Sequence, residues 1–330
     1  MVTLEEIKLA QKRLQGVAVR TPLVRYFPPA TERGYGALEQ LYLKPESMQP
    51  IGSFKLRGAY NKVASLAAEE RARGVITYSS GNHAQGVAYA ARAMNTKAVI
   101  VMPRNAPKIK KDATAALGAE IVEVGSGSEE RRAKAEELAA KHGYVVIPPY
   151  NDAQIIAGQG TVGLEIAEEM PDVELVIVPI GGGGLSSGTA TALKLSGSRA
   201  KVIGVEPALA NDAQQSLRAG KIVEITAERA SSTIADGLRT QSIGALNFEH
   251  IRKYVDDIVA VTEDEIREAM RRMALNARLV AEPSGAVTFA AWLFHREKMP
   301  ESAKTVAVIS GGNAEPNLLA EILGGERKAE

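Results

Sequence analysis

Short apolar runs, rich in β-branched residues, alternate with longer helical stretches through most of this chain. The apolar runs predict strands at residues 74–78, 97–102, 120–124, 144–148, 174–180, 201–206, 257–261 and 305–310. The stretches between them, such as 83–94 and 129–141, predict helices. Continuous apolar strands that alternate with helices are typical of parallel sheets covered on both faces. The pattern therefore predicts an α/β protein.

The predicted strands are more than one small sheet usually holds, so we expect two sheets and two α/β domains. The turn-forming segment "PPYND" at 148–152 is the clearest boundary between them. In open parallel sheets, ligands bind beyond the carboxyl ends of the strands, where loops lead into helices. The segments that follow predicted strands are therefore where we expect the chemistry.

Capping patterns mark several helix starts. Thr3 with Glu6, and Thr262 with Glu265, form the capping-box pattern. Ser53 resembles the cap of another helix, whose first turn would contain Lys55. A positive charge in a first turn opposes the helix dipole, so the local pattern gives no structural reason for this lysine.

Composition narrows the class of protein. The chain has 330 residues, of which 45% are hydrophobic and 24% charged, and its formal net charge is +1. This near-neutral balance, without a Lys/Arg block, gives no electrostatic footprint for nucleic acid or a membrane surface. The absence of cysteine excludes disulfides, thiolate nucleophiles and cysteine-based metal sites. The N-terminus is acidic where a signal peptide would be basic, so we expect a soluble, cytoplasmic protein that acts on a small molecule.

The first candidate segment is "IGGGGLSSG" at 180–188, between a predicted strand and a predicted helix. Consecutive glycines let backbone N–H groups converge on an anion, and the helix N-terminus adds a favourable dipole. A tight turn without a ligand is the alternative, but it does not need four glycines. The segment therefore predicts a phosphate site at Gly181, Gly182, Gly183 and Gly184.

The same loop imitates a dinucleotide-binding fingerprint. Gly182 and Gly184 follow a strand, and Glu206 ends the next strand, where a ribose-binding acid would stand. The third glycine position is Ser187, which makes the match imperfect. An NAD(P)-dependent oxidoreductase therefore stays open as an alternative of a different class, as does a non-catalytic amino-acid-binding protein.

Two further segments follow strands. "YSSGNHAQG" at 78–86 gathers small polar residues at a helix start, which suits a carboxylate or a phenolate oxygen. An ordinary cap would need only one of them. "VISGGN" at 308–313 places Ser310 at a strand end beside two glycines, as a ligand contact or as a turn.

Lys55 and these segments together could bind a single ligand. A desolvated lysine near dipolar groups has a lowered pKa and can form a Schiff base. A phosphate cradle, a carboxylate loop, a lysine and a strand-end serine are together what pyridoxal 5′-phosphate needs. For Lys55 alone, an extended surface lysine would be the simpler interpretation.

At this point the sequence resembles a known family. The motifs "GSFKLRGA" (52–59), "SSGNHAQG" (79–86), "IAGQGT" (156–161), "GGGGLSSG" (181–188) and "SGGN" (310–313) are similar, in order and spacing, to those of fold-type II pyridoxal-phosphate enzymes. The resemblance is to the serine/threonine dehydratase and serine racemase group, and it covers nearly the whole chain. It implies a tryptophan synthase β-like fold of two doubly wound parallel-sheet domains, with the cofactor in the cleft between them. The large domain would comprise residues 1–64 and 149–330, and the small domain residues 65–148.

The resemblance also implies residue roles. Lys55 would form the Schiff base and Phe54 would pack beside the cofactor ring. Asn82 would contact the phenolic oxygen, Gly181 to Gly184 would hold the phosphate, and Ser310 would meet the pyridine nitrogen. The remaining implied contacts are with the substrate carboxylate, from Ser79, Ser80, Gly81 and His83.

The implied reaction is α,β-elimination, in which L-threonine and/or L-serine gives a 2-oxo acid and ammonia. Lys55, once displaced by the substrate amine, would remove the α-proton. A serine racemase, often bifunctional, is the alternative, with Ser80 as the acid on the opposite face. Threo-3-hydroxyaspartate dehydratase is the third possibility and requires a further cation for the second carboxylate, which the sequence does not identify.

A metal site follows from the same resemblance. "VEPALANDAQQS" at 205–216 is similar to the divalent-metal site of serine racemases and hydroxyaspartate dehydratases. Glu206, the backbone carbonyl of Ala210, and Asp212 would bind Mg²⁺ together with waters, a ligand set that suits this ion. Two ordinary acids on a solvated loop are the alternative.

The sequence departs from the pattern in places. Ile51 stands where this group usually has threonine, and Ala84 is the choice typical of threonine dehydratases rather than racemases. The chain ends shortly after "SGGN", so the regulatory domain of biosynthetic threonine dehydratases is not expected. A homodimer or homotetramer is expected from the family alone.

Overall fold

The strands form two sheets in the part of the chain that the computed structural model describes, residues 1–29, 40–79, 81–106, 108–125 and 127–324. The larger sheet has the order β1 (Val24–Arg25), β2 (Gln40–Pro45), β10 (Lys304–Ile309), β7 (Leu175–Pro179), β8 (Lys201–Pro207) and β9 (Asp257–Val261). The smaller sheet has the order β5 (Glu120–Val124), β4 (Ala98–Pro103), β3 (Val75–Tyr78) and β6 (Val145–Val146). Neighbouring strands are parallel except β1 and β2, which are antiparallel.

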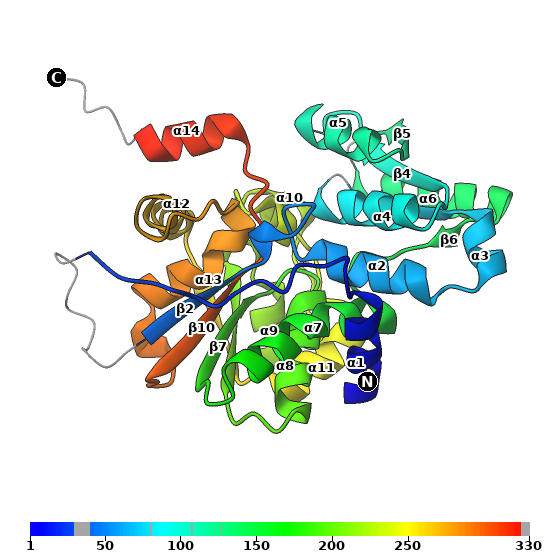
Figure 1. The fold of residues 1–330 in the computed structure, drawn as a ribbon. Coiled ribbons are helices and arrows are strands. Elements are labelled where there is room, and N and C mark those ends of the chain that lie inside the picture. Colours follow the sequence, from blue (N-terminus) through cyan, green and yellow to red (C-terminus); the bar gives the residue numbers. More distant parts are fainter. Residues whose placement is uncertain (30–39, 80, 107, 126, 325–330) are drawn as a thin grey trace, which may run out of the picture.

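Helices cover both sheets (Figure 1). In chain order they are α1 (Leu4–Arg13), α2 (Lys55–Ser65), α3 (Ala68–Arg73), α4 (Asn82–Ala93), α5 (Lys108–Ala116), α6 (Ser128–His142), α7 (Ala153–Glu169), α8 (Gly184–Leu195), α9 (Asp212–Ala219), α10 (Ala227–Ser231), α11 (Ala245–Tyr254), α12 (Glu263–Arg272), α13 (Pro283–Phe294) and α14 (Pro316–Gly324). Shorter helical turns are η2 (Glu46–Met48), η3 (Ala208–Ala210), η4 (Asp236–Leu238), η5 (Met273–Ala277) and η6 (Arg296–Lys298). No helix in the described ranges is both long and apolar enough to cross a membrane.

Alternation along the central strands builds a core on each face of the larger sheet. Leu175 and Ile177 of β7 belong to the cluster that α12 and α13 cover, whereas Val176 and Val178 belong to the cluster with α7, α8 and α11. Successive strand side chains point to opposite faces, so a sheet covered on both sides needs apolar residues at consecutive positions.

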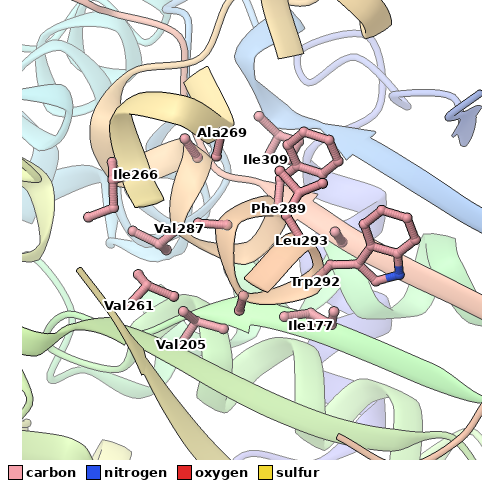
Figure 2. Packing of buried hydrophobic residues seen from close by; sticks show 14 of the residues in the cluster. Ile177, Val205, Val261, Ile266, Ala269, Val287, Phe289, Trp292, Leu293 and Ile309 are labelled. Carbon is pink, nitrogen blue, oxygen red and sulfur yellow. The ribbon is translucent and has the colours of Figure 1, made fainter. Parts of the chain in front are cut away.

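The helix α13 is the central element of the first cluster. Every residue from Pro283 to Leu293 is buried, and Phe289 and Trp292 stack with their ring centroids 6.1 Å apart. Figure 2 shows these side chains above Ile177 and Val205 of the sheet. This packing fixes the N-terminal end of α13, which begins beside the cavity described below.

The helix α2 lies between the two sheets (Figure 1). Its Ala59 and Val63 pack in the core of the smaller sheet, together with α4 and with Ile155 of α7. The helices α2 and α7 approach closely because Gly158 has no side chain; a Cβ at this position would lie 2.7 Å from the Arg57 carbonyl oxygen. The first residue of α2 is thereby held where the two halves of the molecule meet.

Most of the predicted elements are confirmed, one prediction needs correction and one strand was not predicted. The strands and the capping boxes at Thr3 and Thr262 are present. Ser53 does not cap α2: its backbone forms a bridge with Gly311, and its buried hydroxyl has no partner among the described residues. Strand β2 was not expected, since it contains a lysine and ends in proline. The strands of the smaller sheet lie between Val75 and Val146, but the domain limits themselves stay a prediction.

Candidate active site

A cavity of about 760 Å³ lies between the two sheets, at the carboxyl ends of β3, β7 and β10. It brings together eleven of the residues that the sequence predicts for the site. They are Phe54, Lys55, Ser79, Gly81, Asn82, His83, Gly181, Gly182, Gly183, Gly184 and Ser310. Ser80 lies outside the described residues. Segments that are far apart in the chain therefore share one cavity, as expected for the open edge of parallel sheets.

Lys55 is the first residue of α2, and the strand end of β10 fixes the turn before it. The Phe54 N–H donates to the Ser310 carbonyl at 3.0 Å, and the Gly312 N–H donates to the Gly52 carbonyl at 2.9 Å. The Lys55 Nζ donates to the Pro149 carbonyl at 2.8 Å and lies 5.3 Å from the centroid of the Phe54 ring. Burial lowers the pKa of Lys55 to about 8. Its neutral, nucleophilic form is therefore accessible near neutral pH.

The glycine loop joins β7 to α8 and has no room for a side chain at Gly182 or Gly183. Gly183 has φ +94°, in the left-handed region, and a Cβ at Gly182 would lie 2.2 Å from the Tyr150 ring. The first N–H groups of α8 have no acceptor within the helix, and together with the helix dipole they favour an anion at this end. The loop is therefore suited to hold a phosphate group.

Asn82 begins α4 and is held from two sides. Its Nδ2 donates to Glu282 Oε1 at 2.6 Å, and its Oδ1 accepts from Asn313 Nδ2 at 2.8 Å. Burial, together with the Asp236 carboxylate, raises the pKa of Glu282 to about 7, although Lys110 and Asn82 oppose the shift. The site thus contains a carboxyl group that can change its protonation near neutral pH.

His83 is buried behind the lysine. Its Nε2 lies 3.0 Å from the Ile147 carbonyl oxygen. Because a carbonyl oxygen only accepts, this nitrogen must carry a hydrogen. Its Nδ1 has no partner among the described residues. Burial and the nearby Lys55 lower the pKa of His83 to about 3. The imidazole is therefore neutral and adds no charge beside Lys55.

Several cavity residues were not identified from the sequence. They are Tyr150, Glu282, Ser284, Lys110, Asp236 and Arg131. Most do not directly follow a predicted strand, which was the signal used. Glu282 gave no local signal either, because an acid directly before a helix start is ordinary and is favoured by the helix dipole.

The predicted metal ligands lie outside the cavity lining. Both oxygens of Glu206 accept backbone hydrogen bonds at the start of α9, from Ala213 at 3.0 Å and Gln214 at 2.7 Å. Both oxygens of Asp212 are buried without a hydrogen bond of good geometry among the described residues. Burial and the Asp212 charge raise the pKa of Glu206. Burial raises the pKa of Asp212 to about 7, although the backbone N–H groups of Asp212 and Ile243 and the Thr240 hydroxyl oppose the shift. Two buried carboxylates that repel one another are an arrangement that a cation would relieve.

The described residues contain no group of three or more histidine, aspartate or glutamate side chains that could hold a metal ion. The predicted ligand set has two carboxylates, and its third protein ligand is the carbonyl of Ala210. Glu206 also does not face the cavity, so its position does not fit the ribose-binding acid of a dinucleotide site.

Known proteins are similar to this chain over most of its length. The family model of the pyridoxal-phosphate dependent enzymes matches residues 14–311. An L-threonine ammonia-lyase of Thermotoga maritima is 47% identical over 324 residues, 98% of this chain and 78% of that protein. An L-threo-3-hydroxyaspartate ammonia-lyase of Saccharomyces cerevisiae is 42% identical over 87% of both chains. The structure of maize serine racemase has a TM-score of 0.90 and 37% identity, over 96% of this chain and 95% of that one.

Proposed function

This chain belongs to the pyridoxal-phosphate-dependent enzyme family, and from that premise we propose that it is a dehydratase that converts L-threonine and/or L-serine to a 2-oxo acid and ammonia. One observation carries the proposal. The half-buried amine of Lys55, the glycine loop 181–184 and Ser310 line the same cavity, although more than a hundred residues separate each from the next. The similarity to an L-threonine ammonia-lyase along almost the whole chain supports the same activity.

The residues present fit pyridoxal phosphate. Gly181 to Gly184 and the start of α8 would hold its phosphate, since a side chain at Gly182 would fill the space beside Tyr150. Asn82 would donate to its phenolic oxygen, and Ser310 would meet the pyridine nitrogen. When bound, this cofactor supplies an aldehyde carbon for an amine and an electron-withdrawing ring beside the α-carbon.

Lys55 carries the proton transfer in this proposal. Because burial lowers its pKa to about 8, a useful fraction of its amine is neutral near physiological pH and accepts the α-proton of the substrate. The Pro149 carbonyl, 2.8 Å from Nζ, orients the amine, and neutral His83 leaves its basicity undisturbed by a second charge. Ser79, Gly81 and His83 would lie along the substrate carboxylate.

The direct test is the release of 2-oxo acid by the purified protein with pyridoxal phosphate. L-threonine, L-serine, D-serine and threo-3-hydroxyaspartate are compared, each with wild-type protein and with Lys55→Ala. We expect turnover of L-threonine or L-serine by the wild-type protein and a loss of at least about 10³-fold in the variant. Wild-type protein that releases no 2-oxo acid from either L-amino acid would contradict the proposal.

Serine racemase activity is a second candidate, since the structure of maize serine racemase superimposes on most of this chain. In this reading Ser80 protonates the face opposite Lys55. Ser80→Ala should then abolish D-isomer chemistry and leave the visible absorbance of the bound cofactor intact. Unchanged D-serine turnover in this variant would remove Ser80 from the mechanism.

Threo-3-hydroxyaspartate is a third substrate candidate, and Arg131 of α6 supplies the cation that it requires. Arg131 lines the cavity, and its guanidinium makes one hydrogen bond among the described residues, from Nε to the Gly127 carbonyl at 3.3 Å. Its terminal nitrogens therefore have donors to spare for a carboxylate. Arg131→Met should weaken turnover of threo-3-hydroxyaspartate more than that of L-serine.

We also propose a Mg²⁺ site at Glu206, the Ala210 carbonyl and Asp212. The two oxygens of buried Asp212 support it, because neither makes a hydrogen bond of good geometry among the described residues and carboxylate oxygens are suitable ligands for a hard cation. EDTA should lower the melting temperature of the wild-type protein, and Mg²⁺ should restore it. Asp212→Asn should remove this response, and a response that persists in the variant would place the metal elsewhere. A homodimer or homotetramer, and a cytoplasmic location, remain predictions.

A further inference from the structure

A chain of side-chain amides connects the turn before Lys55 to Glu282. Asn313 Nδ2 donates to the Ile51 carbonyl at 2.9 Å and to Asn82 Oδ1 at 2.8 Å. Asn82 Nδ2 in turn donates to Glu282 Oε1 at 2.6 Å. We call the Ile51 carbonyl, Asn313, Asn82 and Glu282 the amide chain. It links four segments of the site, since these residues come from before α2, after β10 and the starts of α4 and α13.

The amide chain has only one consistent polarity. The Ile51 carbonyl at one end can only accept, so it must meet the NH₂ group of Asn313. The second hydrogen of that NH₂ group must then meet an acceptor, which is the Asn82 oxygen. The Asn82 NH₂ group therefore points away from Asn313, with one hydrogen on Glu282 and the other available to the cavity that Asn82 lines.

The Asn313 side chain also packs over the turn that precedes the lysine. Gly52 has φ +73°, and a Cβ at this position would lie 2.3 Å from Asn313 Oδ1. Glycine is needed at position 52 for both reasons, because a side chain would be strained and would displace Asn313. Ile51 takes part in this arrangement through its backbone carbonyl, which accepts from Asn313, whereas its side chain is buried.

We propose that Asn313 is a positioning residue that sets the orientation of the Asn82 amide, so that Asn82 presents an N–H rather than its oxygen to the cofactor. Without Asn313 only Glu282 orients the Asn82 amide, and whenever Glu282 is protonated the amide can rotate by half a turn. Its oxygen would then face the phenolic oxygen of the cofactor and repel it. The inference rests on the proposed function for the identity of the group that Asn82 meets. It concerns Asn313, to which neither the motif "SGGN" nor the fold assigns a task.

A double-mutant cycle tests the proposal, with the affinity of the apoprotein for pyridoxal phosphate as its readout. The affinity is measured by visible absorbance for wild-type protein, Asn313→Ala, Asn82→Ala and the double variant. We expect Asn313→Ala to lower the affinity about tenfold in the wild-type background but less than about twofold in the Asn82→Ala background. Equal losses in both backgrounds, or no loss in either, would overturn the role of Asn313.

Asn313→Asp separates hydrogen bonding from packing. The two side chains have the same shape, but a carboxylate has no N–H for Ile51 or Asn82. We expect Asn313→Asp to lose at least as much affinity as Asn313→Ala, and wild-type affinity in this variant would show that Asn313 only fills space. Asn317→Asp is the matched control, since Asn317 is exposed on α14 only four residues away. It should bind the cofactor as the wild-type protein does.

Two further outcomes are distinguishable. Should the Asn313 variants fail to fold, Asn82→Asp probes the chain from its other end, because it keeps the acceptor for Asn313 and loses the N–H. Its affinity should fall as far as that of Asn82→Ala, and wild-type affinity would overturn the inference. A wild-type protein that takes up no pyridoxal phosphate would instead contradict the proposed function itself.

Discussion

At the scale of single residues, the environment of Lys55 favours a neutral amine. Burial removes water from the ammonium form, and the helix start places a partial positive charge beside it. The carbonyl of Pro149 accepts one hydrogen bond from Nζ but supplies no full negative charge. A buried carboxylate in that place would hold the lysine protonated and unreactive. The awkward charge in the sequence thus has a chemical use.

The lowered pKa of Lys55 predicts how the apoprotein takes up its cofactor. Only the neutral amine attacks an aldehyde, so the rate of pyridoxal phosphate uptake should rise with pH and level off above a midpoint of about 8. An unperturbed lysine would give a midpoint near 10.5. Stopped-flow absorbance between pH 6 and about 10.5 checks this. A rate that still rises steeply above pH 9 would show that burial does not act on Lys55 as described.

Residue type and position predicted the parts of the site that follow strands, such as Asn82 and Ser310. They did not predict Glu282, because its carboxylate is brought to Asn82 by the packing of α13, some 200 residues later in the chain. The role of Ser53 was also misjudged. The neighbouring residues suggested a helix cap, but the Ser53 backbone pairs with Gly311, from the far end of the chain, in an isolated β-bridge.

At the scale of elements, the glycine loop predicts a specific defect. Gly183 and Gly197 both have positive φ, +94° and +83°, so alanine at either position is strained. Only at Gly183 would the new Cβ also collide, 2.8 Å from the Asn247 Cβ, whereas Gly197 has open space. Gly183→Ala should therefore abolish the preference for pyridoxal phosphate over pyridoxal, measured by absorbance titration, and Gly197→Ala should keep it. Retained preference in Gly183→Ala would move the phosphate site elsewhere.

The helix that carries Lys55 is anchored by buried charges. Arg57 of α2 pairs with Glu46 of η2 at 2.7 Å and with Glu165 of α7 at 2.6 Å, and Lys44 of β2 pairs with Glu165 at 2.7 Å. All four side chains are nearly or fully buried. The network explains why β2 was missed from the sequence. Lys44 interrupts the apolar pattern of β2, and nothing local in the sequence shows that Glu165 neutralises it.

Removing one member of this network should be costly. Glu165→Ala leaves Arg57 and Lys44 with too little negative charge in a dry interior, and we expect a loss of about 3–5 kcal/mol of unfolding free energy. Urea unfolding monitored by circular dichroism measures it. Glu137→Ala, which breaks an exposed pair with Lys134, should change stability little. Equal effects of the two substitutions would contradict an anchoring role.

At the scale of the whole molecule, the cavity depends on how the smaller sheet and its helices meet the rest of the protein. Lys110 of α5 forms an ion pair with Asp236 of η4, and both residues line the cavity. Burial lowers the pKa of Lys110, but the Asp236 carboxylate outweighs this effect and raises it. The pair joins α5, beside the smaller sheet, to η4, beside the larger sheet. It should therefore affect how the two parts of the molecule are held together more than how either part folds.

Hydrogen exchange tests this contact. Asp236→Asn should increase the exchange of backbone amides in α5 and leave those of α13 unchanged, because α13 belongs to the core of the larger sheet. Asp112→Asn is the matched control, since it breaks an exposed pair with Lys108 on the same helix. Mass spectrometry of deuterated peptides measures both variants. Equal exchange of α5 in the two variants would show that the ion pair does not hold the parts together.

The sequence predicted two sheets because the strands are apolar at consecutive positions and alternate with helices. It could not predict that α2 would pack between the sheets, since its position is set by close contacts at Gly58 and Gly158 between distant helices. The distribution of charges around the cavity could not be predicted from the sequence either, because it also depends on contacts between distant segments. Lys110, Asp236 and Arg131 meet there only because both sheets place their strand ends at one cavity.

The most direct test of the central claim is the identity of the residue that holds the cofactor. Wild-type protein loaded with pyridoxal phosphate is reduced with borohydride, digested and mapped by mass spectrometry. We expect loss of the visible absorbance and a phosphopyridoxyl group on the peptide that contains Lys55, with none in Lys55→Ala. A label on another lysine, or a wild-type protein that gains no visible absorbance, would contradict it.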